Sequence, residues 1–324
     1  MTLRDPPNER AVESLLRFGV CNLDKPPGPS SHQVADWLKR LVNDALREHD
    51  EQTATENGPD RPGGATSDAG IDRVAHTGTL DPKVTGSLPT LFGDATRIAQ
   101  IFADSTKEYV AVLELQGPAP SDFEAVLGQF EGEIYQKPPR KSAVRRQLRT
   151  RRIHDLELLE RSDGQALLRV RCEAGTYIRK LCHDLGLALG TGAHMGDLRR
   201  TQTGQFDDTT LVTMEDFADA LAFWTEDGDE SWLREILAPA ETALDSLPRV
   251  LIAPSAAREV AKGAPVYAPG VLGVEPAPTD GTAPAQGELV GCFTPDGSVV
   301  CLGTLVGDPD GASGTVVELE RVLV

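Results

Sequence analysis

The sequence has few cysteines and no long apolar run, and both shortages exclude classes of protein. The 324-residue chain has five cysteines and no C-x-x-C pair, so it shows neither zinc-site nor redox-motif spacing. No stretch approaches the roughly 20 apolar residues that span a bilayer, and the first residues resemble neither a signal peptide nor a transit peptide. We therefore expect a soluble, cytoplasmic protein with no membrane partner. Its thiols should be free and buried, at Cys21, Cys172, Cys182, Cys292 and Cys301.

Lysine is also scarce. The chain has 8 lysines, 24 arginines and 50 acidic residues, with a formal net charge of −18 at pH 7. This charge argues against a nucleic-acid partner, because Lys and Arg dominate phosphate binding. The even spread of acidic residues, however, is typical of proteins adapted to high intracellular salt, and we interpret the source as a halophilic archaeon. At molar salt the Debye length falls to about 3 Å, so a diffuse acidic surface repels RNA only weakly.

The length and the 40% apolar content predict two domains, which we place at residues 1–246 and 247–324. Short β-rich runs between Gly and Pro residues make the second a small β-barrel. Within the first, residues 44–72 are polar and acidic, and we expect a disordered insertion there. Residues 271–287 are rich in Pro, Ala, Thr and Gly and are expected to form a loop.

Two segments of the first domain have clear periodicity. KEYVAVLELQG alternates between apolar and polar residues, so Tyr109–Leu115 is predicted to be a strand with one buried face. TYIRKLCHDLGLALG predicts a helix that ends at Gly190 or Gly192. Its inward face should contain Ile178, Leu181, Leu185 and Leu189.

Most candidate functional residues carry a weak signal when taken singly. Asp81 in the G-T-L-D-P segment can be a simple turn residue, because Asp before Pro bonds nearby backbone. Tyr109 alone indicates a strand aromatic, and Arg179 alone a charge on a helix face. A basic run stands out against the acidic chain and is typical of a site for RNA phosphates. It comprises Lys137, Arg140, Lys141, Arg145, Arg146, Arg149, Arg151 and Arg152.

Four motifs in order resemble the pseudouridine synthase family that modifies the tRNA T-loop and includes dyskerin. They are Lys25-Pro26-Pro27-Gly28 with Ser31-His32, His76-Thr77-Gly78-Thr79-Leu80-Asp81-Pro82 with Gly86 and Leu88-Pro89, Lys107-Glu108-Tyr109, and Gly175-Thr176-Tyr177-Ile178-Arg179. The stretches QKPPRKSAVRRQLRTR and GLALGTGAHMGDLRRTQTGQF are similar to the archaeal, dyskerin-like branch. The C-terminal part resembles a PUA domain, a small RNA-binding barrel.

The resemblance implies an α/β (α+β) catalytic domain around a largely antiparallel mixed sheet, followed by the PUA barrel. It makes Asp81 the catalytic carboxylate, Tyr109 the ring that stacks on the target base, and Arg179 the partner of Asp81. Residues before Phe18 would pack on the barrel. The chemistry breaks the N1–C1′ bond and rejoins the base through C5, so it needs no cofactor and no metal. We expect RNA contacts from Lys25, His76, Lys107, Lys141, Arg145 and Arg146.

The resemblance also implies partners. The leading hypothesis is an RNA pseudouridine synthase that isomerises uridines in rRNA, directed by an H/ACA guide RNA and small archaeal H/ACA proteins. One alternative is a stand-alone tRNA T-loop synthase. Another is an RNA-binding scaffold without catalysis. The sequence leaves open whether Asp81 attacks the sugar or the base.

Overall fold

The computed structural model describes residues 3–56, 70–138, 145–278 and 281–324. Its larger sheet consists of β1 (Gly19–Lys25), β2 (Val74–His76), β3 (Thr85–Phe92), β4 (Lys107–Leu115), β5 (Gly132–Gln136), β6 (Arg149–Arg161), β7 (Gln165–Cys172), β8 (Ala193–Thr203) and β9 (Ala238–Pro239). The strand order is β5-β6-β7-β4-β8-β3-β1-β9, with β2 paired to β3. Among the described pairings of these strands, β3 with β8 is parallel and the others are antiparallel. The expected mixed, largely antiparallel sheet is confirmed.

Helices cover this sheet at several points. They are α1 (Val12–Arg17), α2 (Ser31–Glu56), the 3-10 helix η1 (Gly93–Phe102), α3 (Phe123–Gly128), α4 (Ile178–Ala188), η2 (Asp208–Thr210), α5 (Met214–Asp227), α6 (Ser231–Ile236) and η3 (Ala240–Leu244). The predicted apolar face of α4 is buried, and Gly190 follows the helix with φ 72°, as a terminating glycine should. No helix in the described part of the chain is long and apolar enough to cross a membrane.

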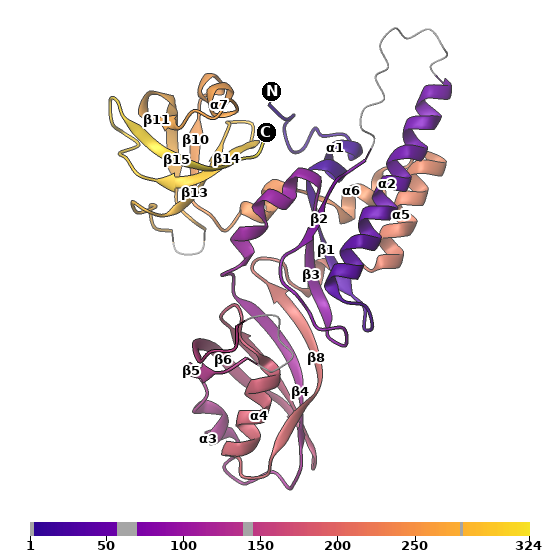
Figure 1. Ribbon diagram of the computed structural model, residues 1–324, viewed down its shortest axis with the longest axis vertical. Helices are drawn as coiled ribbons and strands as arrows, with labels where there is room; N and C mark the ends of the chain where they lie inside the picture. The colour runs from indigo at the N-terminus through magenta and orange to yellow at the C-terminus, as the bar shows by residue number, and fades with distance from the viewer. Residues whose placement is uncertain (1–2, 57–69, 139–144, 279–280) are drawn as a thin grey trace.

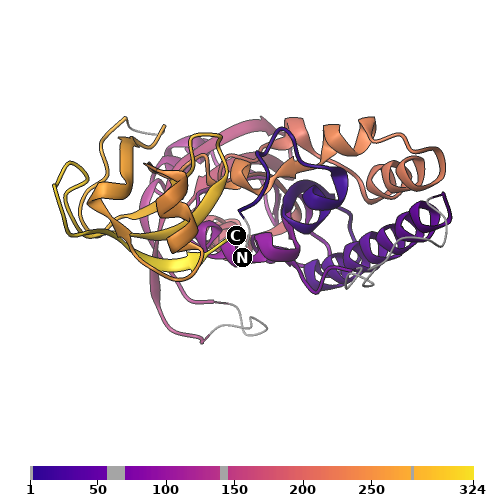
Figure 2. The same ribbon diagram turned by 90° about the horizontal axis from the view of Figure 1, so that it is seen from above.

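The C-terminal sheet has six strands in the order β11-β15-β14-β13-β10-β12. Its elements are β10 (Arg249–Ile252), α7 (Pro254–Val260), β11 (Val266–Tyr267), η4 (Ala268–Gly270), β12 (Val271–Glu275), β13 (Leu289–Phe293), β14 (Val299–Leu305) and β15 (Thr315–Val322). Figures 1 and 2 place this curled sheet and the α2–α5 helix pair on opposite sides of the molecule, with the β4–β8 half and α4 extending away from both.

The prediction of a disordered insertion at 44–72 is wrong for the first and last residues of that range. Helix α2 continues to Glu56, because Ala45 and Leu46 repeat the apolar spacing of its first turns and are buried. Further along, the His49 ring stacks on Trp224 of α5, with 4.4 Å between ring centroids. At the other end, the Asn43 side chain accepts a 2.7 Å hydrogen bond from the Ile71 N–H. Residues 57–69 of the expected insertion lie outside the described residues.

The loop expected at 271–287 is also partly wrong. Residues 271–275 form β12, which pairs antiparallel with β10. The Val and Leu of this segment suit a strand, and its Pro-rich composition begins only afterwards. In the same sheet Cys292 and Cys301 are opposite each other in the β13–β14 register, and all five cysteines are free and buried. The expected free thiols are confirmed.

The N-terminal segment joins the two sheets. Arg4 donates a 3.0 Å hydrogen bond to the Leu323 carbonyl, and the Ser298 hydroxyl donates to the Asp5 carbonyl. A buried bidentate ion pair links Arg10 to Glu241, which also accepts a hydrogen bond from the backbone N–H of Val299. The expected packing of residues before Phe18 on the C-terminal sheet is confirmed.

Candidate active site

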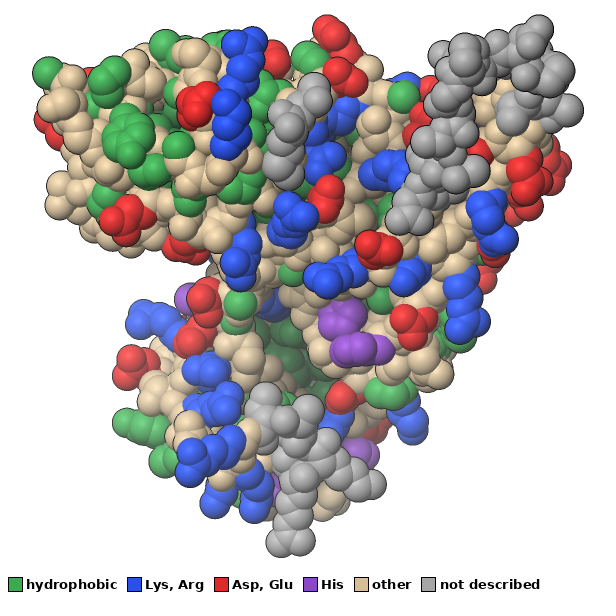
Figure 3. All heavy atoms as spheres, turned by 45° about the horizontal axis from the view of Figure 1, so that its top comes forward, with side chains coloured by type: hydrophobic (Ala, Val, Ile, Leu, Met, Phe, Trp, Pro, Cys, Tyr) green, Lys and Arg blue, Asp and Glu red, His purple; other side chains and the backbone are tan. Residues whose placement is uncertain are grey.

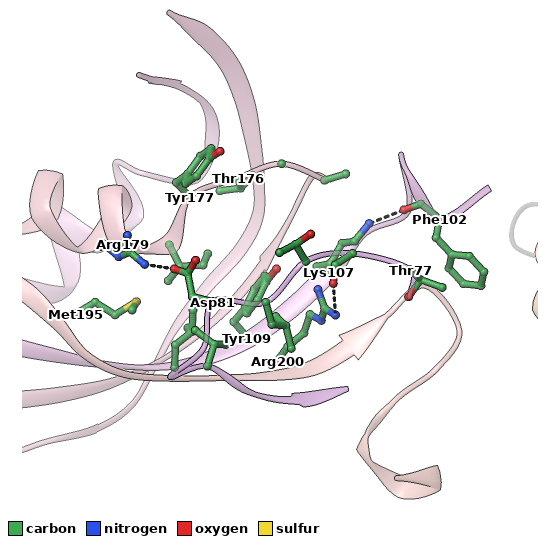
Figure 4. A pocket seen from close by; sticks show the side chains of 18 of the residues that line it. Thr77, Asp81, Phe102, Lys107, Tyr109, Thr176, Tyr177, Arg179, Met195 and Arg200 are labelled. Carbon is green, nitrogen blue, oxygen red and sulfur yellow. Dashed lines mark hydrogen bonds and ion pairs between the residues drawn. The ribbon is translucent and has the colours of Figure 1, made fainter. Parts of the chain in front are cut away.

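A pocket of about 290 Å³ opens in the larger sheet, where β4 and β8 meet two loops. One loop follows β2 and the other leads into α4. Figure 4 shows side chains from all four segments converging on this space. The pocket is lined by Thr77, Gly78, Thr79, Leu80, Asp81, Val84, Phe102, Ala103, Lys107, Tyr109, Ala174, Gly175, Thr176, Tyr177, Ile178, Arg179, Met195, Leu198 and Arg200. All three residues expected to be catalytic are therefore in one cavity.

Asp81 and Arg179 face each other at the pocket mouth. Arg179, in the first turn of α4, donates a hydrogen bond to the Asp81 carboxylate (Figure 4). The Arg179 side chain is 49% exposed and that of Asp81 is 55% exposed. A ligand in the pocket could therefore reach the carboxylate, and the guanidinium fixes its orientation.

The loop that carries Asp81 is anchored from both sides. The hydroxyl of Ser31, the first residue of α2, accepts a 2.9 Å hydrogen bond from the Leu80 N–H. The Lys25 ammonium donates to the carbonyls of Pro26, Pro82 and Val84 at 2.9, 3.1 and 2.9 Å. Two of these acceptors, Pro82 and Val84, lie within three residues after Asp81, so Lys25 fixes the turn that follows the carboxylate.

Lys25 cannot serve as the expected RNA contact. Its side chain is 0% exposed, and its three N–H groups already have carbonyl acceptors. Burial lowers the pKa of its amine. The structure thus contradicts a phosphate contact and gives Lys25 a structural function instead.

Lys107 is similarly occupied. It is 6% exposed, and its ammonium donates to the Phe102 and Ser105 carbonyls, each at 2.7 Å. Burial, with the nearby Arg200 charge, lowers the pKa of Lys107 to about 8. It lines the pocket, but its ammonium is already held by carbonyls, so an exposed phosphate is not its expected partner.

Tyr109 lies on β4 next to Arg200, and both residues line the pocket. Its ring is partly exposed to the cavity, as stacking on a base requires. Burial raises the pKa of its phenol, while the charge and side-chain hydrogen bond of Arg200 act in the opposite direction. Arg200 itself is 1% exposed, and the sequence analysis did not identify it. It follows Leu198 by two residues on β8, and this strand spacing puts it on the same inward face.

His76 stands outside the pocket lining, next to Thr77. Its Nε2 lies 3.4 Å from Nδ1 of His32, with the two rings edge to face. Burial, together with the charges of His32 and Arg200, lowers the pKa of His76 to about 4. Because a pKa of about 4 leaves the His76 ring neutral near pH 7, the ring suits contact with a base better than contact with a phosphate.

The basic run is only partly visible. Lys141 and Arg140 lie outside the described residues. Arg145 and Arg146 are exposed, and Arg146 donates a 3.1 Å hydrogen bond to the Pro138 carbonyl. Neither arginine lines the pocket, and both side chains are exposed to solvent. No cluster of His, Cys, Asp or Glu with metal-binding geometry occurs among the residues whose placement is described.

Three family profiles match: "DKCLD (NUC011) domain" at 5–35, "TruB family pseudouridylate synthase (N terminal domain)" at 67–178, and "tRNA pseudouridylate synthase B C-terminal domain" at 179–245. The chain belongs to the TruB family of pseudouridine synthases, enzymes that isomerise uridine in RNA.

Relatives cover nearly the whole chain. A "Probable tRNA pseudouridine synthase B" of Haloarcula marismortui is 61% identical over 324 residues, covering 100% of this chain and 94% of the relative. A protein of the same description from Halobacterium salinarum is 54% identical over 332 residues, covering 100% of both chains. Both sources are halophilic archaea, in keeping with the interpretation of the composition.

Solved structures agree with this assignment. A chain in the "Crystal Structure of a Cbf5-Nop10-Gar1 Complex" superposes with a TM-score of 0.83 at 39% identity, covering 99% of this chain and 90% of that chain. A chain in the "Structure of H/ACA RNP bound to a substrate RNA containing 2'-deoxyuridine" gives 0.83 at 38% identity, with the same coverage.

Proposed function

We propose that this protein isomerises specific uridines in rRNA as the catalytic subunit of an H/ACA ribonucleoprotein, with tRNA as a second substrate. The observation that carries the proposal is the pocket in which the Asp81–Arg179 pair and the Tyr109 ring meet. The similarity to chains in H/ACA complexes, over 99% of this chain, supports the guide RNA and the small H/ACA proteins as partners.

In this proposal Asp81 is the catalytic carboxylate, Tyr109 contacts the target base, and Arg179 orients Asp81. The target uridine leaves its stack at a cost of a few kcal/mol. Stacking on Tyr109 offsets part of that cost, since a base–aromatic stack contributes about 1–3 kcal/mol. Asp81 then acts at the sugar or the base as a nucleophile or a charge-stabilising group.

RNA would be held on a cationic surface outside the pocket. Figure 3 shows Lys and Arg side chains gathered on the face next to a hollow in the molecule. A surface groove between η1 and the C-terminal sheet is lined by Arg73, Arg97 and Arg321. Together with Arg145 and Arg146 these arginines are the proposed phosphate contacts, and residues 247–324 are proposed to be a PUA domain that contacts the guide RNA.

Pseudouridine mapping tests the function. An rRNA fragment and a tRNA are each incubated at high salt with purified protein, with and without guide RNA and partner proteins. Guide-dependent conversion of rRNA that vanishes in Asp81→Ala supports the proposal. Conversion of tRNA alone, without guide, favours a stand-alone tRNA synthase, the activity named for the archaeal relatives. If the protein binds RNA but converts no uridine under any of these conditions, the proposal that it is an enzyme is wrong.

RNA affinity tests the cationic surface. Arg145→Glu combined with Arg146→Glu should weaken binding and reduce its salt dependence, because fewer counterions are released. The matched control is Arg40→Glu with Arg47→Glu, which makes the same charge change on exposed residues of α2. Equal losses in the two double variants would show a general charge effect and not a local contact.

A further inference from the structure

Arg200 is a buried cation at the pocket. It is 1% exposed, and no carboxylate of a described residue lies within ion-pair range of it. An unpaired buried charge costs several kcal/mol, so it persists in a fold only where other groups hold it. The neighbouring Arg199 differs, because it forms a bidentate pair with Asp24 at 3.0 and 2.8 Å.

Backbone carbonyls hold the Arg200 guanidinium in place. Its Nε donates to the Ser87 carbonyl at 2.7 Å and its Nη2 to the Gly78 carbonyl at 3.1 Å. A Cβ at Gly78 would lie 3.3 Å from Nη1, so the glycine allows this close approach. These bonds occupy one side of the guanidinium fork and fix its direction.

The other side meets Tyr109. Tyr109 and Arg200 are direct partners in the antiparallel register of β4 and β8, so their side chains share one face of the sheet. The two side chains interact there, and of the two groups the guanidinium is the one that can only donate a hydrogen bond, while the phenol oxygen can accept it. Figure 4 shows the Tyr109 and Arg200 side chains next to each other in the pocket.

This donor changes what the Tyr109 hydroxyl can do. When its oxygen accepts from the Arg200 guanidinium, the hydroxyl keeps its own proton for another acceptor, such as a base in the pocket. Burial raises the pKa of the phenol, and the Arg200 charge and hydrogen bond counter that increase. The guanidinium therefore favours the phenolate relative to the same phenol without it.

We propose that Arg200 is a positioning residue for the isomerisation, which orients the Tyr109 hydroxyl and stabilises its phenolate when that hydroxyl exchanges a proton with the base. The inference rests on the proposed role of Tyr109. The reaction moves one proton from C5 to N1 of the base. The hydroxyl gives its proton to N1 and takes one from C5, whose C–H electron pair returns to the ring. Tyr109 ends the cycle as it began.

A double-mutant cycle tests the proposal. Single-turnover conversion is measured for wild type, Arg200→Lys, Arg200→Gln and Tyr109→Phe, and for each Arg200 variant combined with Tyr109→Phe. Loss of a proton-transfer group costs about 10²–10⁴-fold, so Arg200→Gln should fall by about 10²-fold and Arg200→Lys by less. In the Tyr109→Phe background the same substitutions should cost less than about 3-fold, because the hydroxyl on which they act is gone.

Arg199→Gln is the matched control, since it removes a neighbouring guanidinium on the same strand that does not line the pocket. It should keep wild-type conversion. Equal losses from Arg200→Gln in both backgrounds would overturn the proposal. Absence of conversion by wild type would instead contradict the proposed function, so the two failures are distinct.

Phenol ionisation gives a second readout that a purely structural role would not move. The chain has 4 tyrosines, and the ultraviolet titration difference between wild type and Tyr109→Phe isolates Tyr109. The pKa of this phenol should be higher in Arg200→Lys than in wild type, and higher still in Arg200→Gln. An unchanged titration would overturn the proposal. If Arg200→Gln does not fold, Arg200→Lys decides both measurements.

Discussion

Arg179 reaches from the first turn of α4 to the Asp81 carboxylate and closes one side of the pocket mouth, while about half of each side chain stays exposed. Ion pairs with this exposure contribute about 0–1 kcal/mol to the free energy of unfolding. The stability of the fold therefore does not explain the pair. Its location at the pocket fits the proposed role, in which Arg179 orients the Asp81 carboxylate.

The first prediction concerns this pair. Asp81→Asn keeps the size of the side chain and removes its charge, so conversion should fall by about 10³-fold or more while RNA affinity stays within about 3-fold. Arg179→Lys should retain part of the activity, and Arg179→Ala less, with unfolding temperatures close to wild type. A large loss of unfolding temperature in Arg179→Ala would mean that the pair is structural.

Tyr109→Phe keeps the ring and removes the hydroxyl. Stacking on the base should persist, so RNA affinity is expected to be unchanged, while conversion falls by about 10²-fold or more. Filter binding and single-turnover conversion on one RNA measure both. Tyr135, which is exposed on β5, provides the control Tyr135→Phe. A wild-type rate in Tyr109→Phe would remove the phenol from the chemistry.

Lys25→Met tests the anchor of the Asp81 loop. The substitution leaves three carbonyls without their donor, and we expect a loss of about 2–4 kcal/mol in the free energy of unfolding together with lower activity. The salt dependence of RNA binding should not change, since no phosphate contact is lost. Lys262→Met, at an exposed lysine paired with Glu259, is the control. A reduced salt dependence with unchanged stability would restore Lys25 as an RNA contact.

His76 predicts a pH effect. Its pKa in the folded protein is about 4, against 6.5 for an ordinary histidine. A lowered pKa means that the unfolded chain binds the proton more readily. Stability is therefore complete above pH 6.5 and decreases as the pH falls toward 4. After allowance for solvent screening the contribution is about 1–2 kcal/mol.

His76→Gln should remove that part of the acid sensitivity. Between pH 7.5 and 4.5 at fixed salt, the unfolding temperature of the variant relative to that of wild type should rise as the pH falls. RNA affinity should lose the same factor at pH 7.5 and pH 6, because the ring is neutral at both. A loss confined to the lower pH would show that His76 binds RNA in its charged form.

The buried Arg10–Glu241 pair gives a prediction on stability. Arg10→Met leaves the Glu241 carboxylate buried without its cation, and such changes cost about 3–5 kcal/mol. The expected result is a lower unfolding temperature with separation of the C-terminal sheet from the rest. Limited proteolysis near residues 245–248 reports that separation. Unchanged protection there would show that other contacts keep the parts together.

Periodicity allowed the sequence to predict β4 and the apolar face of α4, because each pattern has a direct geometric cause. The mixed, largely antiparallel type of the larger sheet was expected from the family resemblance. At residues 44–56 the polar composition predicted disorder, but the structure has a helix there. The polar residues there occupy the exposed face of α2, and the few apolar ones were enough to bury its inner face. In a helix the spacing of apolar residues matters more than their number.

The sequence predicted which residues belong to the site, but not whether each side chain is buried or exposed. Asp81, Tyr109 and Arg179 were found through their motifs. Lys25 and Lys107 were expected to contact RNA because they belong to the motifs of the family resemblance, and nothing in the sequence shows that carbonyls surround these two. Arg200 adjoins Arg199 in the chain, and only the two-residue alternation of β8 distinguishes the buried arginine from the exposed one.

The bond between Arg4 and the Leu323 carbonyl joins residues 319 positions apart. During synthesis on a ribosome the N-terminal arm emerges first, yet the strands on which it packs are made last. The N-terminal arm therefore has no binding partner until translation is nearly complete. Its docking would then be a late step, so truncated chains should leave this arm open to proteases.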